Sequence, residues 1–500
     1  MLDNVSEPGL LEPEYLDRQP RDRKVDPIAT TRLAPARIPG SAQDQTFIAV
    51  DELPEDDALA LLRSHQPDGR FPSQAEDDEA RAIARLLEGF TLAVETTAIY
   101  LGRHPGSDSC RRLRERLRTE LLAESETSAG DPSVAVRHRE RLLATTLEPT
   151  FETLSPEAIH LLTLASLLPA DAIALPWLQA VAAQQIQAFR PTVDLLQGLR
   201  LFQATEVADS GGEQLVARMH RLVQEVVKKR WPDDLAARER ALLDHIRARA
   251  DFLWEGWVRH EHRWELAPLT ACADRWLEHE GDDGPWLASH VAGPLQALGN
   301  FAGAERLNRR ALERTRPDHG NFAARLNNLA ELLRTTNRLA EAEPLLRRAL
   351  ATSEASLGAD HPLVATELNN LAVLLQATNR LTEAEPLFRR ALAIDEAAYG
   401  RDHPDVARDL NNLAGLLRAS NRLAEAEPPY RRAVEVLLKF THATGHEHPH
   451  FRTFTNNYAG LLAATGLSNA QIEARLNEIG RPFGMLLAGG APPGNETRPG

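Results

Sequence analysis

The stretch "LNNLAELLRTTNRLAEAEPLLRRAL" at residues 326–350 decides the fold, because the chain repeats it. The LNNLA box returns at Leu368 and Leu410, each 42 residues after the copy before it, and "TNNYA" at residues 455–459 is an altered fourth copy after a spacing of 45. Several boxes that recur in register at one period indicate stacked structural units. We count four recognisable units and a degenerate leading one, from about residue 285 to residue 466.

Each unit predicts two helices. In the first, Leu326, Leu329 and Leu333 recur at the spacing of one helix face, and in the second Ala342 and Leu346 do the same. Glutamates and arginines four residues apart on the second helix predict surface ion pairs, because side chains at this spacing are neighbours. The predicted pairs are Glu343 with Arg347, Glu385 with Arg389, and Glu427 with Arg431.

The paired asparagines of the box need an explanation, because an asparagine inside a helix costs about half a kcal/mol relative to alanine. With the leucines of the first helix facing the core, Asn327 and Asn328 fall on the opposite flank, beside Arg334. Since an amide both donates and accepts hydrogen bonds, a ladder of such pairs would bind the backbone of an extended peptide. The alternative is that Asn328 and its equivalents bridge adjacent repeats through backbone carbonyl groups. The two roles are compatible.

Helix pairs of this kind resemble tetratricopeptide (TPR) repeats. The 42-residue spacing, the LNNLA box and the EAEPL–RRAL box are similar to those of the kinesin-light-chain type, over residues 285–466. The resemblance implies a right-handed superhelix whose first helices line a concave groove for a peptide or protein segment. The predicted peptide-binding residues are Asn327, Asn328, Arg334, Asn369, Asn370, Gln376, Asn411, Asn412, Arg418, Asn456 and Asn457. Arg334, Gln376 and Arg418 occupy a position that varies between repeats and would supply selectivity.

The N-terminal half has other patterns. Residues 46–64 predict a short strand, a turn and a helix, and residues 79–103 predict two helices broken at Gly89. Ser155 followed by Pro156 is typical of a helix start, since serine caps the helix and proline fits its first turn. Residues 192–231 predict two further helices with a short hairpin between them.

In this order the segments resemble the second half of the NB-ARC module of STAND signalling ATPases. "IATTR" is similar to the sensor strand that ends in Arg32, and residues 89–93 are similar to a box in which Thr91 takes the place of an adenine-contacting proline. Residues 154–231 resemble the winged-helix part, where His220 of the Met-His-Arg triplet would face the β-phosphate of bound ADP. Residues 235–285 resemble the helical adaptor that leads into the repeats.

The chain departs from that family where the phosphates would be held. A P-loop needs a glycine followed by lysine and serine or threonine, and none of the four lysines of the chain follows a glycine. Walker A and Walker B motifs are therefore absent, and Arg32 and His220 are interpreted as relics or structural groups. We expect no ATPase activity and no cofactor. The alternative is that the chain, as a truncated or split ATPase, binds ADP or ATP together with a separate P-loop subunit.

The composition limits the classes of partner. A formal charge of −15 and a pI near 5.6 disfavour a general binder of nucleic acid or of anionic membranes, whose surface would be basic. Two distant cysteines, Cys110 and Cys272, can form neither a disulfide framework nor a cysteine metal site. The N-terminus lacks the basic start and apolar stretch of a signal peptide, so we expect a cytoplasmic protein without membrane contact. The histidines of residues 442–450 fall in an inter-repeat turn, which explains them without a metal.

These features predict a mainly α protein, in which a helical ARC-like and winged-helix-like N-terminal region precedes an α-solenoid of TPR helix pairs. The predicted segments are a degenerate remnant (1–45), an ARC-like domain (46–150), a winged-helix-like domain (151–234), a helical adaptor (235–284), the TPR superhelix (285–466), and a helix with a disordered tail (467–500). We expect a non-enzymatic protein–protein interaction protein in STAND-type signalling, whose N-terminal region couples the groove to a partner or to self-association. The alternatives are the nucleotide switch and a winged-helix transcription regulator with a TPR sensor.

Overall fold

The structure is a computed structural model that describes residues 2–5, 29–31, 52–106, 109–122, 132–205, 215–255 and 260–487. The chain divides into two compact units, residues 1–153 and residues 154–500, and each is described by itself. Helices dominate both units, which confirms the predicted mainly α fold. Among the described residues, no helix has the length and the apolar character needed to cross a lipid bilayer.

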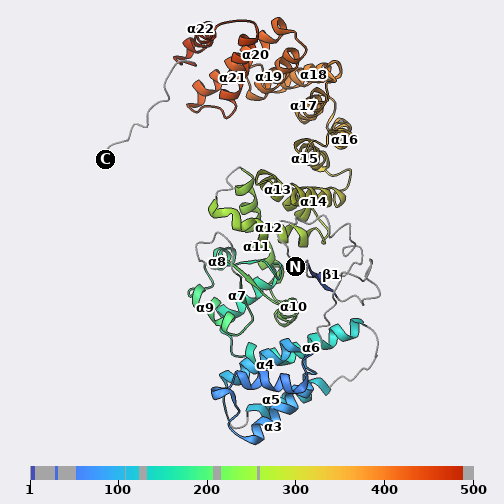
Figure 1. Cartoon of the computed structure of the whole chain (residues 1–500), viewed down its shortest axis with the longest axis vertical. Helices are drawn as coiled ribbons and strands as arrows, with labels where there is room; N and C mark the ends of the chain where they lie inside the picture. Colours follow the sequence, from blue (N-terminus) through green and yellow to red (C-terminus); the bar gives the residue numbers. More distant parts are fainter. Residues whose placement is uncertain are drawn as a thin grey trace, which may run out of the picture. The chain divides into compact units, whose positions relative to one another are not determined.

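The first unit is a helical domain with one pair of parallel strands. Its elements are β1 (Leu2–Val5), β2 (Ala29–Thr31), α2 (Glu55–Ser64), η3 (Pro67–Gly69), α3 (Gln74–Leu86), α4 (Thr91–Arg103), α5 (Ser109–Leu122) and α6 (Pro132–Phe151) (Figure 1). The predicted break at Gly89 is confirmed. Gly89 has a φ of 69°, and a Cβ there would lie 2.1 Å from the backbone oxygen of Leu53, so only glycine fits. The strand predicted before residue 51 lies outside the described residues.

The second unit begins with a small module of helices and a three-stranded sheet. Its elements are α7 (Pro156–Ser166), β3 (Ile173–Ala174), α8 (Leu175–Val181), α9 (Phe189–Gly198), β4 (Gln203–Thr205), β5 (Val216–Arg218) and α10 (Arg221–Arg230). The strands are antiparallel in the order β3-β5-β4, so β4 and β5 form the predicted hairpin. The predicted cap of α7 is also present, because the Ser155 hydroxyl accepts a hydrogen bond from the Ala158 N–H at 3.3 Å. The winged-helix resemblance stays a prediction.

A long helix joins this module to the repeats. α11 (Leu235–Trp254) packs on α7 and α8 and also on α13, and it is followed by η4 (His260–Glu265) and α12 (Leu266–Trp276). Glu265 is 2% exposed and accepts hydrogen bonds from Trp177 Nε1 at 3.0 Å and from Arg249 Nε at 2.8 Å. Because Trp177 belongs to α8 and Arg249 to α11, this buried carboxylate ties the module to the connecting helix.

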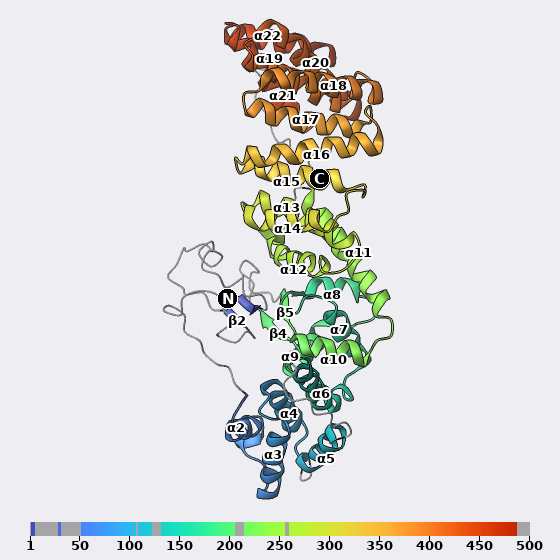
Figure 2. The same ribbon diagram turned by 90° about the vertical axis from the view of Figure 1, so that its right-hand side faces the viewer.

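The rest of the second unit is a stack of five helix pairs, which we number repeats 1 to 5 (Figure 2). In chain order the first and second helices are α13 (Asp283–Ala297) and α14 (Phe301–Glu313), α15 (Phe322–Thr335) and α16 (Leu339–Leu357), α17 (Pro362–Ala377) and α18 (Leu381–Tyr399), α19 (Pro404–Ala419) and α20 (Leu423–Thr444), and α21 (Phe451–Ala464) and α22 (Asn469–Gly480). A short turn, η5 (Arg481–Phe483), follows the last pair. The predicted C-terminal helix is α22, and the tail after residue 487 lies outside the described residues.

The turn between the two helices of a repeat depends on an asparagine. Asn337, Asn379 and Asn421, the first residues of the three NRLxEAEP boxes, all have a φ of 59°. This left-handed region is unfavourable for most side chains, but asparagine tolerates it comparatively well. The recurrence of asparagine at this place therefore has a backbone explanation, separate from that of the asparagine pair in the first helix.

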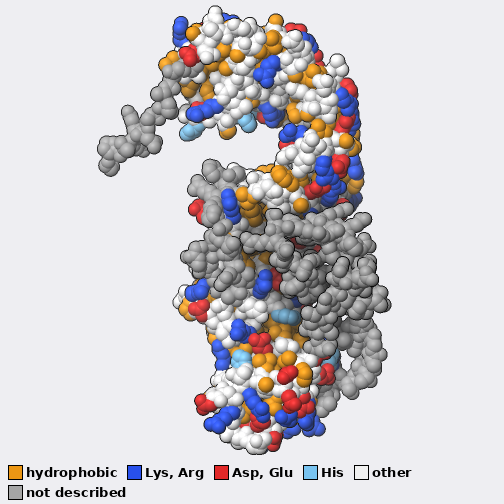
Figure 3. All heavy atoms as spheres, viewed as in Figure 1, with side chains coloured by type: hydrophobic (Ala, Val, Ile, Leu, Met, Phe, Trp, Pro, Cys, Tyr) orange, Lys and Arg blue, Asp and Glu red, His pale blue; other side chains and the backbone are white. Residues whose placement is uncertain are grey.

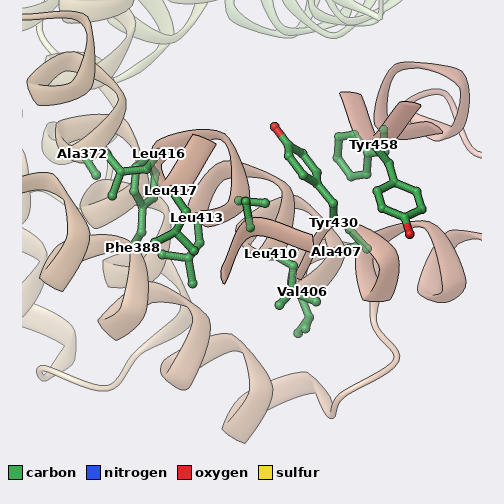
Figure 4. Packing of buried hydrophobic residues seen from close by; sticks show 14 of the residues in the cluster. Ala372, Phe388, Val406, Ala407, Leu410, Leu413, Leu416, Leu417, Tyr430 and Tyr458 are labelled. Atoms are coloured by element: carbon green, nitrogen blue, oxygen red, sulfur yellow. The ribbon is translucent and has the colours of Figure 1, made fainter. Parts of the chain in front are cut away.

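The core between repeats is built from leucine, alanine and a few aromatic residues, as the stripe on the first helix predicts. In Figure 4, Leu413 and Leu417 of α19 lie near Phe388 of α18, and all three belong to one buried cluster. Ala372 and Ala414, at the same position of successive first helices, are fully buried. Small side chains at these positions let neighbouring helices approach closely.

Two of the three ion pairs predicted on the second helices are confirmed and one is wrong. The confirmed pairs are Glu343 with Arg347 and Glu385 with Arg389, both at 2.7 Å. In the third case Arg431 pairs with Glu435 at 2.8 Å. Glu427 instead accepts hydrogen bonds from Tyr458 and Arg475, both at 3.3 Å. Those two residues reach it from the last repeat, which a spacing rule for a single helix cannot foresee.

Candidate functional site

The first helices of the five repeats form one continuous wall. α13, α15, α17, α19 and α21 each pack against the next first helix, whereas the second helices of repeats 1 to 4 do not approach one another to the same extent. In a curved stack the elements that lie closer together are on the inside of the curve, so the first helices line the inner face. On the face of the repeats that Figure 3 shows, acidic and basic side chains are interspersed.

The asparagine pairs form a ladder along this wall. Asn370 Nδ2 donates to Asn327 Oδ1 at 3.4 Å, and Asn412 Nδ2 donates to Asn369 Oδ1 at 3.5 Å. Asn457 Nδ2 continues the series by donating to Asn411 Oδ1 at 3.0 Å. In repeats 3, 4 and 5 the second asparagine therefore bonds the first asparagine of the repeat before it. The predicted bridging between repeats is thus present, but it joins side chain to side chain and does not use backbone carbonyl groups.

The first asparagine of a pair also bonds an acidic side chain of the next repeat. Asn369 Nδ2 donates to Asp409 Oδ1 at 2.6 Å and to the Ala365 carbonyl at 3.1 Å, and Asn327 donates in the same way to Glu367. Asn369 is only 4% exposed. The expectation that the first asparagines face solvent is therefore wrong at Asn369, because the next repeat covers it.

The acidic partners are functional residues that the sequence analysis missed. Glu367 and Asp409 are almost fully buried, and burial raises the pKa of Glu367 to about 7 although hydrogen bonds from Asn327 and Ser353 oppose this. A carboxyl group out of water disfavours its charged form, which is why its pKa rises. The available signal was an acid two residues before the asparagine pair, in "ELNN" and "DLNN", where repeat 2 has "RLNN".

Part of the predicted binding surface stays open. The side chains of four predicted residues make no hydrogen bond or ion pair with the described part of the chain, namely those of Asn328, Gln376, Arg418 and Asn456. Gly460 leaves room beside Arg418, whose Nη1 lies 3.3 Å from where a Cβ on Gly460 would be, and Gly415 lies three residues before Arg418 on α19. Arg334 differs, because Glu331 accepts two hydrogen bonds from it at 2.6 and 2.7 Å. Each of the first helices α15, α17, α19 and α21 thus carries one open polar side chain in addition to the bonded asparagines of the ladder.

The residues predicted to contact nucleotide belong to different parts of the chain. Thr91 is the exposed first residue of α4 in the first unit, and His220 lies in the second unit. Arg32 lies outside the described residues. His220 Nδ1 accepts a hydrogen bond from the Leu222 N–H at 3.2 Å and so caps the start of α10.

The same histidine cap recurs at the inter-repeat turns. His361, His403 and His448 each accept, through Nδ1, a hydrogen bond at 3.2 Å from the N–H two residues later. A ring nitrogen at a helix start satisfies one of the N–H groups that have no partner within the helix. This explains the repeated "DHP" and "EHP" of the sequence and gives His220 a structural role. Within the described ranges, no group of three or more histidine, cysteine or acidic side chains could hold a metal ion.

A family model described as tetratricopeptide repeat matches residues 285–355, 321–397 and 363–439. The chain carries tetratricopeptide repeats. TPR repeats are protein–protein interaction units. The general prediction of a protein–protein interaction protein is therefore confirmed. No curated protein matches the chain.

Several solved structures have a similar fold. A putative kinesin light chain from Podosopora anserina with nearly identical TPR-like repeats is 21% identical, with a TM-score of 0.35, over 41% of this chain and 97% of that one. BtubC (BKLC) from P. vanneervenii is 22% identical, with a TM-score of 0.37, over 51% of this chain and 96% of that one. A STAND protein with a tetratricopeptide repeat sensor from Pyrococcus horikoshii is 13% identical, with a TM-score of 0.29, over 92% of this chain and 70% of that one. At these identities the likenesses concern the fold and carry no inference about function.

Proposed function

We propose that the inner wall of the TPR stack binds an extended segment of a protein partner through its amide and guanidinium groups. The observation that carries the proposal is the row of polar side chains without partners, Asn328, Gln376, Arg418 and Asn456, which follow one another along successive first helices. An extended peptide offers a carbonyl or an N–H at every residue. A row of fixed donors and acceptors can therefore bind its backbone whatever its side chains are.

The asparagine ladder would prepare the wall for this binding. Asn370 and Asn412 each use one N–H to bond the preceding repeat, which leaves their second N–H and their carbonyl oxygen for a ligand. Because the ladder already holds these amides in place, little rotational freedom is lost when a peptide binds. Selectivity would come from the open side chains, above all from the Arg418 guanidinium beside Gly460.

We also propose that the module formed by α7 to α10 transmits the binding of a partner by the repeats to a further protein, in a regulatory or signalling role. The support for this is that α11 packs on the module at α7 and α8 and on the first repeat at α13. DNA binding finds no such support. The exposed side of α9 carries an ion pair between Arg190 and Asp194 at 3.2 Å and an exposed Leu195, and no row of basic side chains lies among its described residues. His220 is engaged as a helix cap, so the nucleotide alternative also lacks a supporting observation.

A random peptide library displayed on phage tests the groove. The full chain should enrich peptides, and the double variant Gln376→Ala with Arg418→Ala should lose most of their binding. Each lost hydrogen bond costs about 1 kcal/mol, so binding of the enriched peptides should fall by roughly tenfold or more. Leu363→Ala is the matched control, since Leu363 is 54% exposed in the first turn of α17, at the opposite end of the helix from Gln376. No enrichment over empty beads, or equal binding to the double variant, would contradict the proposal.

A further inference from the structure

Two aspartates meet inside the junction between repeats 3 and 4. Asp395 lies on α18 and Asp409 on α19, and they are 1% and 0% exposed. Their carboxyl groups are within hydrogen-bonding reach of each other. Two carboxylates at such a distance in a buried site cannot both be charged without strong repulsion. The pair is therefore stable as one carboxylic acid that donates a hydrogen bond to one carboxylate.

The neighbouring cation does not neutralise both acids. Arg408 of α19 lies 3.5 Å from Asp395 Oδ2 and 3.7 Å from Asp409 Oδ1, and it donates a hydrogen bond to neither of these oxygens. Its closest contact is with Asp405, at 2.9 Å, and Asp405 is also 3.3 Å from His403 at the start of the same helix. One partly exposed guanidinium is thus shared among three carboxyl groups.

The remaining neighbour of the pair is the neutral amide of Asn369 on α17, which donates to Asp409. This single hydrogen bond leaves several oxygen atoms of the pair unsatisfied. Both oxygens of Asp395 and Oδ2 of Asp409 are buried without a partner when the two groups are treated as charged. A shared proton supplies the missing donor. Among the described residues, the charged and titratable groups facing the pair are then Arg408, Asp405 and His403, all on α19.

The equivalent positions differ at the other junctions of the stack. When the first position is counted from the box that opens the second helix and the second position from the asparagine pair, the corresponding side chains are Thr315 with Arg325 between repeats 1 and 2, Ser353 with Glu367 between repeats 2 and 3, and Leu437 with Phe454 between repeats 4 and 5. Arg325 donates to Thr315, and Ser353 hydrogen-bonds Glu367. Leu437 and Phe454 belong to the apolar core. The acid pair is thus peculiar to one junction.

We propose that the junction between α18 and α19 is a proton-dependent hinge, closed while Asp395 and Asp409 share one proton and opened when that proton is lost to water. Opening exposes both groups to solvent, where an aspartate has an ordinary pKa of about 4 and is charged at neutral pH. Opening therefore releases one proton. Between the ordinary pKa of an exposed aspartate and the raised pKa of the closed pair, each unit of pH should raise the population of the open state by about tenfold.

The shifts of the two groups agree with this direction. Burial, reinforced for Asp409 by the charge of Asp395, raises the pKa of both carboxyl groups. For an acid with a raised pKa in the closed state, the stabilisation is complete below its ordinary pKa and is lost as the pH rises through the raised value. The hinge is thus closed in mildly acidic solution and loosens toward alkaline solution.

Hydrogen exchange of the full chain, resolved by mass spectrometry, tests the hinge. After correction for intrinsic exchange, α18 and α19 should lose protection between about pH 5 and pH 7, by up to tenfold per unit, and the slope should level off above the raised pKa of the pair. α21, whose junction is apolar, is the internal control and should show no such slope. The Asp395→Asn variant should lose the slope, because an amide donates to Asp409 without needing a shared proton. Asp360→Asn, at an exposed acid of the preceding inter-repeat turn, should keep it.

A second measurement covers the case in which Asp395→Asn does not fold. Infrared spectroscopy of the Glu367→Gln variant, which lacks the other buried acid whose pKa is raised to about 7, should show the carbonyl stretch of a protonated carboxyl group at about pH 6, and the band should fade toward pH 8. The proposal is overturned if α18, α19 and α21 share one pH slope, if a folded Asp395→Asn protein keeps it, or if no protonated carboxyl group is present. Asp395→Ser copies Ser353 of repeat 2. This variant removes the carboxyl group but keeps a hydroxyl donor, so it separates the effect of losing the shared proton from the effect of losing a hydrogen-bonding side chain.

Discussion

Replacing Asn369 by alanine separates a side chain that holds repeats together from one that only faces a ligand. The amide of Asn369 donates to Asp409 at 2.6 Å and to the Ala365 carbonyl at 3.1 Å, in a site that is 4% exposed. A hydrogen bond to a buried acid is worth about 1.5–3 kcal/mol, and alanine returns about half a kcal/mol through its helix preference. Asn369→Ala should therefore weaken the junction between repeats 3 and 4 by about 1–2.5 kcal/mol.

Asn456 provides the matched control, because it holds the same position in repeat 5. It is exposed, and it makes no hydrogen bond within the described part of the chain. Asn456→Ala should therefore leave the stability of repeat 5 unchanged or raise it by about half a kcal/mol. The two variants share their chemistry and their place in the motif, so the difference between them reports only on what surrounds the side chain.

The assay has to resolve single repeats. All seven tryptophans precede residue 287, so intrinsic fluorescence does not follow repeats 2 to 5, and hydrogen exchange by mass spectrometry is the suitable measurement. Protection of α17 to α19 should fall roughly 5- to 70-fold in Asn369→Ala, since 1.36 kcal/mol corresponds to tenfold. Equal protection in Asn369→Ala and in the unmodified chain, or a larger loss in Asn456→Ala, would refute the stitching role.

Three further predictions concern other parts of the molecule. Because burial raises the pKa of Glu367 to about 7, the stabilisation by this group is complete below about pH 4 and is lost as the pH rises through 7. The loss amounts to about 3 kcal/mol in all. Glu367→Gln should remove this pH dependence from the hydrogen exchange of α16 and α17 and should leave the stability near pH 5 almost unchanged. Gly89→Ala should unfold or strongly destabilise the first unit in thermal melts, because its Cβ would clash with Leu53 at a φ of 69°, whereas Gly69→Ala, which meets no atom within 4 Å, should cost only the strain of its own φ of 68°, about 1 kcal/mol. Glu265→Ala should destabilise the contact of α8 with α11 by about 3–5 kcal/mol, since it leaves Arg249 without its buried partner, and tryptophan fluorescence in urea should detect this through Trp177.

The repeat architecture could be predicted because it depends on local and periodic signals. The apolar stripe of Leu326, Leu329 and Leu333 indicates a helix with one buried face, and the recurrence of this stripe every 42 residues indicates stacked repeat units. The helix break at Gly89 and the helix cap at Ser155 could be predicted as well, because both depend on only a few neighbouring residues. The predicted domain boundaries and the NB-ARC resemblance stay predictions, because they rest on loose motifs and not on a period.

The surroundings of the asparagines could not be predicted from a single helix. Whether Asn369 faces solvent depends on how far the next repeat is rotated over it, and that rotation is a property of two repeats and not of one. The open surface nevertheless includes four of the predicted residues, because positions such as Gln376 and Arg418 lie about two turns beyond the ladder on the same face. Glu427 was assigned the wrong partner for the same reason, since Tyr458 and Arg475 come from another repeat.

The polar side chains at the junctions have a consequence for the order of the stack. Repeats 2, 3 and 4 carry almost the same leucine and alanine boxes, so apolar packing alone distinguishes poorly between the correct neighbour and the next one along. The junction residues do distinguish them. If α18 packed against α21 and skipped repeat 4, Asp395 would face Phe454, and its carboxyl group would be buried without any hydrogen bond, at a cost of about 1–3 kcal/mol or more. If α20 packed against α17, Leu437 would take the place of Ser353, and Glu367 would lose its hydroxyl partner. Each buried polar pair makes its own junction less stable than an apolar junction would be. The same pair destabilises an incorrect contact between repeats even more. Buried polar groups are known to fix register in this way, so the order of repeats 2 to 5 is specified where their sequences differ.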